Sequence, residues 1–338
     1  MGLRLAEPGE FTRRAFLGGK LDLTQAEAIG DLVAAETEAQ RRQALRQLDG
    51  ALGGLYRRWS QSLLHLLARL EAVIDFPDED LPAEIEHEVT HESEAIAREI
   101  ALHLADNRRG ERLRDGIVIA IIGPPNAGKS SLLNAIAQRE VAITSPIAGT
   151  TRDVIEMAID LAGYPVVFAD TAGLRDSVDA IEQEGLRRAV ARAATAELRL
   201  FVFDVARLQD TAGAEAWPGP DTLLVANKMD LYSGSGPVPA TAHCVSALSG
   251  EGVPALLTAL AARIADVYDG AAPLLTRARH RAALEEAHAA LARSFVASLP
   301  ELRAEDLRIA WRSLGRITGR ADVEDLLDVI FADFCIGK

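Results

Sequence analysis

The chain of 338 residues is predicted to contain an α/β domain with a doubly wound, mainly parallel sheet, inserted into a discontinuous all-α domain. Three observations predict this class. Short aliphatic runs alternate with amphipathic segments between residues 117 and 267, a glycine-rich turn follows the first of these runs, and the sequence on both sides has helical periodicity. The length is sufficient for two domains or three.

The first helical stretch runs from Thr24 to about Val73. Thr24 and Glu27 have the spacing of a capping box, which predicts a helix start there. Three glycines between residues 50 and 54 can mark a break between two helices, because each costs about 1 kcal/mol relative to alanine. We expect an intramolecular bundle seam, rather than an intermolecular coiled coil, from the apolar stripe Leu45, Leu48, Leu52, Leu55, Trp59, Leu63, Leu66, Leu70 and Val73.

The α/β region has short, strand-like apolar runs separated by helical segments. Cys244 lies in the last of these runs and is expected in the core. Strands are predicted at Ile117–Ile122, Val154–Asp160, Tyr164–Asp170, Leu198–Asp204, Thr222–Asn227 and Ala242–Val245, and helices between them at Lys129–Arg139, Ile181–Ala193 and Val253–Val267. Helical periodicity returns after Gly270, and we expect the two helical stretches to pack together as one domain.

Composition limits the class of protein. Lys and Arg number 36 against 50 Asp and Glu, and the net charge of −14 disfavours broad adhesion to nucleic acid or to an anionic membrane. Two cysteines cannot form a disulfide framework, and the longest aliphatic run is too short to span a membrane. With no signal peptide recognisable, a soluble cytoplasmic protein without a membrane partner is expected.

The turn after the first predicted strand matches a phosphate-binding loop. Residues Gly123 to Ser130 fit G-x-x-x-x-G-K-[ST] at a strand end and a helix start, as this motif requires. The glycines allow backbone N–H groups to surround phosphates, and Lys129 supplies a positive charge to the β- and γ-phosphates. The hydroxyl of Ser130 can bind Mg²⁺.

Further motifs follow in the order that a guanine-nucleotide switch needs. Thr150 or Thr151 precedes the second strand and can complete a Mg²⁺ shell while a γ-phosphate is present. Asp170–Gly173 ends the third strand, near the metal and the γ-phosphate. Asn227–Asp230 ends the fifth strand, where the Asp230 carboxylate can accept both N–H donors of guanine, a pair that adenine lacks. A backbone N–H of Ser246–Leu248 can bind guanine O6.

These motifs together predict a P-loop GTPase of the Ras-like type, an enzyme that hydrolyses GTP. The residues expected to surround GTP are Asn126, Ala127, Gly128, Lys129, Ser130, Ser131, Ser145, Pro146, Ile147, Ala148, Gly149, Thr150, Thr151, Asp170, Thr171, Ala172, Gly173, Asn227, Lys228, Met229, Asp230, Ser246, Ala247 and Leu248.

The catalytic apparatus departs from the Ras pattern. Leu174 stands where Ras-like proteins carry the glutamine that orients water, and leucine cannot hold water. The protein is therefore either a slow switch, or another group orients the nucleophile. The candidates for that role are Asp176, Asp179, Glu182 and Glu184, and Arg152 and Arg175 could act as an arginine finger. The carboxamide of Asn126 could hold a monovalent cation such as K⁺ against the phosphates in place of that charge.

Segments outside the nucleotide motifs carry a resemblance. Glu7–Thr12, Arg14–Leu17, Gly19–Ala28, Ile74–Pro77 and Phe334–Lys338, together with the nucleotide motifs, resemble the MnmE (also TrmE) family of tRNA modification GTPases, within the TrmE-Era-EngA-like group. The resemblance covers nearly the whole chain, and its first and last blocks are absent from ordinary GTPases.

The resemblance implies a K⁺-dependent GTPase that is activated when two G domains meet as a homodimer. Its partners would be tRNA and an MnmG-like flavoprotein, with which it forms 5-carboxymethylaminomethyluridine, or the aminomethyl form, at the wobble position. Mg²⁺ would be held by Ser130 and Thr151, and Glu182 would orient the attacking water. The implied K⁺ ligands are Asn126 and the carbonyls of Ser145, Ile147 and Thr150.

The family's end segments imply two further sites. Cys335 would act in the modification chemistry as a nucleophilic thiolate, although a spectator cysteine is an alternative. Lys20 and Lys338 match contacts to a one-carbon tetrahydrofolate. Relatives carry roughly a hundred further residues before Glu7, which form the folate-binding and dimerising domain. That domain is almost absent from this sequence, through truncation, a wrongly assigned start or a natural short form, so the sequence gives little reason to expect folate binding or a stable dimer from this chain alone.

The resulting domain prediction is 1–18 for the remnant of the folate-binding domain, 19–114 for the first part of the helical domain, 115–270 for the G domain and 271–338 for the second helical part. Two other functions remain open. One is a ribosome-assembly GTPase of the Era or EngA type, which would carry an RNA-binding appendage. The other is a GTP-binding adaptor that lacks modification activity.

Overall fold

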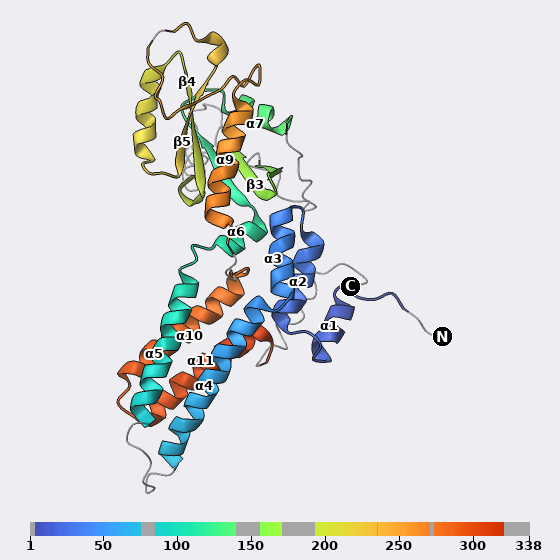
Figure 1. Ribbon diagram of the computed structural model, residues 1–338, viewed down its shortest axis with the longest axis vertical. Coiled ribbons are helices and arrows are strands. Elements are labelled where there is room, and N and C mark those ends of the chain that lie inside the picture. Colours follow the sequence, from blue (N-terminus) through green and yellow to red (C-terminus); the bar gives the residue numbers. More distant parts are fainter. Residues whose placement is uncertain are drawn as a thin grey trace, which may run out of the picture. The chain divides into compact units, whose positions relative to one another are not determined.

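The computed structural model describes residues 4–75, 85–139, 156–170, 193–234, 236–270 and 274–320. These residues form two compact units (Figure 1). The helical unit contains the described residues of Met1–Ala35, Gln40–Arg114 and Ala271–Lys338, and the sheet unit contains those of Glu36–Ala39 and Asp115–Gly270.

The helical unit is built on four long helices that pack side by side in a ring, in the order α4, α5, α10, α11 and back to α4 (Figure 1). Leu63, Leu66 and Leu70 of α4 are almost fully buried in its core, with Leu284 of α10 and Leu314 of α11. The predicted bundle seam is therefore confirmed over α4. The helices assigned wholly or largely to this unit are α1 (Glu10–Leu17), α2 (Leu23–Ala34), α3 (Glu38–Leu48), α4 (Ala51–Asp75), α5 (Ile85–Leu104), α6 (Arg109–Asp115), α10 (Ala278–Val296) and α11 (Pro300–Thr318).

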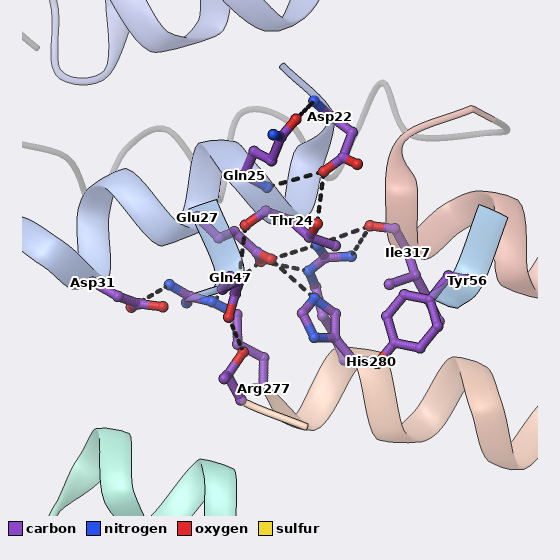
Figure 2. A network of polar contacts seen from close by, with 12 residues as sticks. Asp22, Thr24, Gln25, Glu27, Asp31, Gln47, Tyr56, Arg277, His280 and Ile317 are labelled. Carbon is purple, nitrogen blue, oxygen red and sulfur yellow. Dashed lines mark hydrogen bonds and ion pairs between the residues drawn. The ribbon is translucent and has the colours of Figure 1, made fainter. Parts of the chain in front are cut away.

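The first helical stretch differs from the prediction at its start. The capping box is formed by Asp22 and Gln25: the Asp22 carboxylate accepts from the Gln25 N–H at 3.0 Å, and the Gln25 side chain accepts from the Asp22 N–H at 3.0 Å. The predicted box of Thr24 and Glu27 is wrong, because Thr24 donates its hydroxyl to Asp22 and Glu27 is buried among arginines (Figure 2). An acidic side chain at Asp22 is a stronger acceptor than the threonine hydroxyl.

The stretch also contains two breaks. One separates α2 from α3, and the other falls at Asp49 and Gly50, while the glycines at 53 and 54 lie inside α4. Leu45 and Leu48 are only partly buried, because α3 buries Gln43, Ala44 and Gln47 instead. The seam is thus confined to α4.

The sheet unit has a sheet in the order β2-β3-β1-β4-β5-β6, parallel except for the antiparallel β2–β3 pair. The central strand β1 is buried on both faces, as its uninterrupted aliphatic sequence predicts. The elements of this unit are β1 (Ile117–Ile122), α7 (Lys129–Ala137), β2 (Glu156–Leu161), β3 (Tyr164–Asp170), β4 (Leu198–Asp204), η1 (Leu208–Ala216), β5 (Thr222–Asn227), η2 (Met229–Leu231), β6 (His243–Cys244) and α9 (Val253–Tyr268).

The α/β class and the insertion between helical stretches are confirmed. The predicted helix Ile181–Ala193 lies outside the described residues except for its last position. Cys244 is in a strand as expected, but it is exposed, which corrects the expectation of a core position. The reason is that β6 is an edge strand of only two residues, paired on one side with β5. None of the helices within the described ranges combines the length and apolar character needed to cross a membrane.

Candidate nucleotide-binding site

The predicted phosphate loop joins β1 to α7 at the carboxyl edge of the parallel strands, where open α/β sheets bind ligands. Lys129 begins α7 and is buried, and its ammonium group donates to the carbonyls of Gly123 at 2.8 Å and Pro124 at 2.9 Å. The charge therefore lies against the loop backbone. Since α7 begins here, its first N–H groups and its dipole favour an anion at the same place.

Glycine is required at position 128 for two reasons, its backbone conformation and the closeness of the Asn227 side chain. Its φ of 89° lies in the left-handed region, which side-chain-bearing residues rarely adopt. A Cβ at this position would lie 2.3 Å from Nδ2 of Asn227. The second glycine of the motif thus allows β5 to approach the phosphate loop.

Asn227 joins three segments of the site. Its side chain is 1% exposed, and its Nδ2 donates to the carbonyl of Ala127 at 2.9 Å. Its Oδ1 accepts from the N–H of Ala247 at 3.0 Å. Its backbone carbonyl accepts from the N–H of Val205, directly after β4, at 3.0 Å. One buried carboxamide therefore sets the spacing between the phosphate loop and the Ser246–Leu248 turn.

Asp230 is held by a hydroxyl from the turn that follows β6. The buried Ser246 donates to Oδ1 of Asp230 at 2.5 Å and accepts from the N–H of Ser249 at 3.2 Å. Asp230 itself is exposed, so its carboxylate is accessible to solvent while the Ser246 hydroxyl fixes its orientation. This arrangement presents a fixed acceptor for a pair of N–H donors. Because Ala247 N–H is engaged by Asn227, a guanine O6 would share that N–H or take the N–H of Leu248.

Lys228 has a partner that the sequence reasoning missed. Its ammonium group donates to Oδ2 of Asp204 at 2.8 Å, and Asp204 is the last residue of β4. Partial burial alone would raise the pKa of Asp204, but the hydrogen bond and charge of Lys228 hold this pKa below its ordinary value. Lys228 also has a positive φ of 66°. The sequence did contain a signal for this pair, because Asp204 ends β4 in the same way that Asp170 ends β3.

The backbone of Asp170 is brought near the phosphate loop, because β3 pairs with β1 so that Asp170 lies opposite Ile121. Asn126 and Ser130 are exposed on the loop and at the start of α7, as is Ser131. Lys20 is exposed between α1 and α2 of the helical unit. The predicted residues that lie outside the described ranges are Ser145, Pro146, Ile147, Ala148, Gly149, Thr150, Thr151, Thr171, Ala172, Gly173, Glu182, Cys335 and Lys338, together with the alternatives Arg152, Leu174, Arg175, Asp176, Asp179 and Glu184.

The ions expected at a phosphate loop of this kind are Mg²⁺ and K⁺, and the side chains around the loop can be checked for groups that would bind them. Within the described ranges no three His, Cys, Asp or Glu side chains gather as a metal site. The hydroxyl of Ser130 and the carboxamide of Asn126 are hard oxygen donors on the exposed rim of the phosphate loop. Mg²⁺ and K⁺ prefer oxygen ligands, and Mg²⁺ in such sites is shared with substrate phosphates, so the donor chemistry fits both ions.

The chain is similar to known proteins over its whole length. The family model described as the MnmE helical domain matches residues 23–335. The tRNA modification GTPase MnmE of Parvibaculum lavamentivorans is 56% identical over 342 residues, covering 100% of this chain and 77% of that protein. The protein of the same name from Paramagnetospirillum magneticum is 58% identical, covering 100% of this chain and 78% of its own.

A solved structure is similar to part of the chain. The G domain of the T. maritima FeoB iron transporter aligns with a TM-score of 0.32 and 20% identity, covering 44% of this chain and 98% of that one.

Proposed function

We propose that the sheet unit of this chain binds and hydrolyses GTP as part of wobble-uridine modification. The chain belongs to the MnmE family of tRNA modification GTPases, which supports this proposal. The observation that supports guanine-nucleotide binding most strongly is the bridge formed by Asn227, which connects the phosphate loop to the Ser246–Leu248 turn. Through this bridge the predicted phosphate loop and the predicted base-binding turn would be held at a fixed separation.

Selection of guanine is assigned to Asp230. An ionised carboxylate is an acceptor only, so it suits the N1–H and the amino group of guanine and rejects bases that offer an acceptor at either position. The hydroxyl of Ser246 orients this carboxylate before the base arrives. Pre-orientation lowers the entropy lost on binding, which supports both affinity and specificity.

Hydrolysis is assigned to groups around the phosphate loop. Lys129 and the first N–H groups of α7 would bind the β- and γ-phosphates, and Glu182 would orient the attacking water. Ser130 and Thr151 would hold Mg²⁺, and Asn126 with the carbonyls of Ser145, Ile147 and Thr150 would hold K⁺. When bound, these cations supply positive charge that offsets the charge on the transferring phosphoryl group.

The modification itself is assigned to the chain acting with an MnmG-like flavoprotein on tRNA, with two G domains meeting on GTP binding. The product would be 5-carboxymethylaminomethyluridine or its aminomethyl form. Cys335 would contribute a thiolate, and Lys20 and Lys338 match the family's contacts to a one-carbon tetrahydrofolate, whose binding we do not propose for this chain alone. Since the chain carries a net charge of −14, local arginines and the partner protein would provide most of the attraction for tRNA.

The experiment that tests this proposal compares GTP hydrolysis in K⁺ and in Na⁺, with nucleotide selectivity measured on the same preparation. Faster hydrolysis in K⁺, together with a preference of Asp230→Asn for xanthosine triphosphate over GTP, would support the assignment. The amide of that variant offers a donor to the xanthine C2 carbonyl. Equal rates of GTP hydrolysis in both salts would contradict the proposed K⁺ site. A Glu182→Ala variant that binds GTP normally and hydrolyses it at the parent rate would show that Glu182 does not orient the attacking water.

A further inference from the structure

The lysine and the aspartate of the Asn227–Asp230 segment carry opposite charges close together in the chain. Lys228 directly precedes η2 and Asp230 lies within it, and a lysine side chain is long and flexible enough to reach a carboxylate in the same turn. An ion pair between them would occupy the acceptor that is assigned to guanine. In the part of the chain that the structure describes, the Lys228 ammonium pairs instead with Asp204, at 2.8 Å.

The Asp204 carboxylate is oriented by the turn that follows β4. Its Oδ1 accepts from the N–H of Ala206 at 2.9 Å, while its Oδ2 accepts from the ammonium group of Lys228. The backbone carbonyl of Asp204 also accepts from the N–H of Arg207 at 2.9 Å. Two backbone N–H groups therefore hold this residue in place independently of the lysine, so the carboxylate is a fixed anchor for the ammonium group.

The two carboxylates that could bind the Lys228 ammonium differ in exposure. The Asp204 side chain is 14% exposed and that of Lys228 is 30% exposed, whereas Asp230 is classed with the exposed residues of the chain. Opposite charges attract more strongly where water is partly excluded than they do in open solvent. Asp204 is therefore the stronger competitor for the ammonium group, and the Asp230 carboxylate is left accessible.

Asp230 is positioned by contacts that do not involve Asp204. The hydroxyl of Ser246 donates to Oδ1 of Asp230 at 2.5 Å. The backbone of the segment is held by the N–H of Met229, which donates to the carbonyl of Val245 at 3.1 Å. Loss of the Asp204 carboxylate should therefore leave the guanine acceptor in place and release only the lysine ammonium.

The pairing of β4 with β5 is also independent of the Asp204 side chain. The two strands pair in parallel from Arg199 opposite Thr222 to Asp204 opposite Asn227. Directly after this register, the N–H of Val205 donates to the carbonyl of Asn227 at 3.0 Å. A variant without the Asp204 carboxylate should thus retain the sheet at this edge.

We propose that Asp204 is a positioning residue that determines nucleotide specificity. It holds the Lys228 ammonium at the end of β4, so that the Asp230 carboxylate meets the base without a cation bound to it. This role rests on the proposed binding of guanine nucleotides by the sheet unit. A carboxylate paired with an ammonium group accepts less well from the two N–H donors of guanine, because the ammonium occupies part of its acceptor capacity.

The test measures the ratio of the dissociation constants for ITP and GTP, by competition titration of the full chain. ITP lacks the amino group of guanine, so this ratio reports on the acceptor at Asp230. In Asp204→Asn the ratio should fall by about fivefold, because the released ammonium competes for the Asp230 carboxylate. The matched control Asp221→Asn makes the same change of charge at an exposed position directly before β5, and it should keep the parent ratio.

A second substitution separates positioning from a merely structural role. Lys228→Met keeps the length of the side chain and removes the ammonium group, so Asp204→Asn combined with Lys228→Met should recover the parent ratio to within about twofold. A structural defect would persist or grow in the double variant. The defect of Asp204→Asn should also shrink between about 0.1 M and 1 M salt, because salt screens an exposed ion pair.

The outcomes distinguish this role from the proposed function. A parent chain that binds neither nucleotide would overturn the proposed function and the role of Asp204 with it. A parent that prefers GTP, beside a folded Asp204→Asn variant with an unchanged ratio or a double variant without recovery, would overturn the role of Asp204 alone.

Lys228→Met provides the test if Asp204→Asn does not fold. Its ratio should stay within about twofold of the parent, because the ammonium group is given no part in selecting the base. Only the ratio is expected to be preserved, not the affinity for either nucleotide. A ratio that falls in folded Lys228→Met would show that the ammonium itself selects the base, which would overturn the role of Asp204.

Discussion

Replacement of Asn227 by alanine should weaken nucleotide binding by separating the two halves of the site. The variant loses the hydrogen bonds of 2.9 Å to the Ala127 carbonyl and 3.0 Å from the Ala247 N–H. Each such bond contributes about 1 kcal/mol net, and more when a buried partner is left without a hydrogen bond. A total of about 1–3 kcal/mol corresponds to roughly 5- to 150-fold weaker binding of GDP and GTP.

The assay is equilibrium titration with a fluorescent guanine nucleotide, with circular dichroism to establish that the variant is folded. Ser249→Ala serves as the control, because the exposed Ser249 hydroxyl accepts from the neighbouring Glu251 N–H at 3.3 Å and leaves the bridge intact. The control should bind as the parent does. Parent-like affinity in a folded Asn227→Ala variant would refute the idea that this side chain sets the geometry of the site.

Three further predictions concern specificity and stability. Ser246→Ala should reduce discrimination of GTP against ITP by a few-fold in competition titrations, because the Asp230 carboxylate loses the hydroxyl that orients it and ITP lacks the amino group. Leu63→Ala should lower the free energy of unfolding by about 2–5 kcal/mol in urea titrations, since Leu63 is fully buried in the bundle core. Burial lowers the pKa of His280, with Glu27 opposing this shift, so its stabilising contribution is present above the ordinary pKa of 6.5 and is lost as the pH falls. The parent should therefore lose stability as the pH falls below about 6.5 in the same titrations, and His280→Gln should show a shallower dependence.

The placement of the candidate nucleotide-binding segments at strand ends could be predicted from the sequence because each motif is local. The phosphate loop, Asp170 and the Asn227–Asp230 segment all follow aliphatic runs, and parallel strands bring their carboxyl ends to one edge. The central β1 was placed with its observed limits for the same reason, since its uninterrupted apolar sequence fits a strand buried on both faces.

What the sequence did not reveal depends on distant or competing partners. Arg277 contacts Asp31 across a separation of 246 residues, and no local pattern encodes that pairing. The helix start was misplaced because Asp22 and Thr24 both can cap, and only packing shows that Thr24 is buried and donates to Asp22. Cys244 was expected in the core because hydrophobicity alone does not show that its strand lies at the edge of the sheet.

The most direct test of the central claim is nucleoside analysis of tRNA from cells in which this chain replaces the resident wobble-modifying GTPase. The account predicts 5-carboxymethylaminomethyluridine, or its aminomethyl form, at the wobble position, and loss of this nucleoside when the chain carries Asp230→Asn. Unmodified wobble uridine in cells that accumulate the folded, GTP-hydrolysing chain would contradict the account and favour a GTP-binding adaptor.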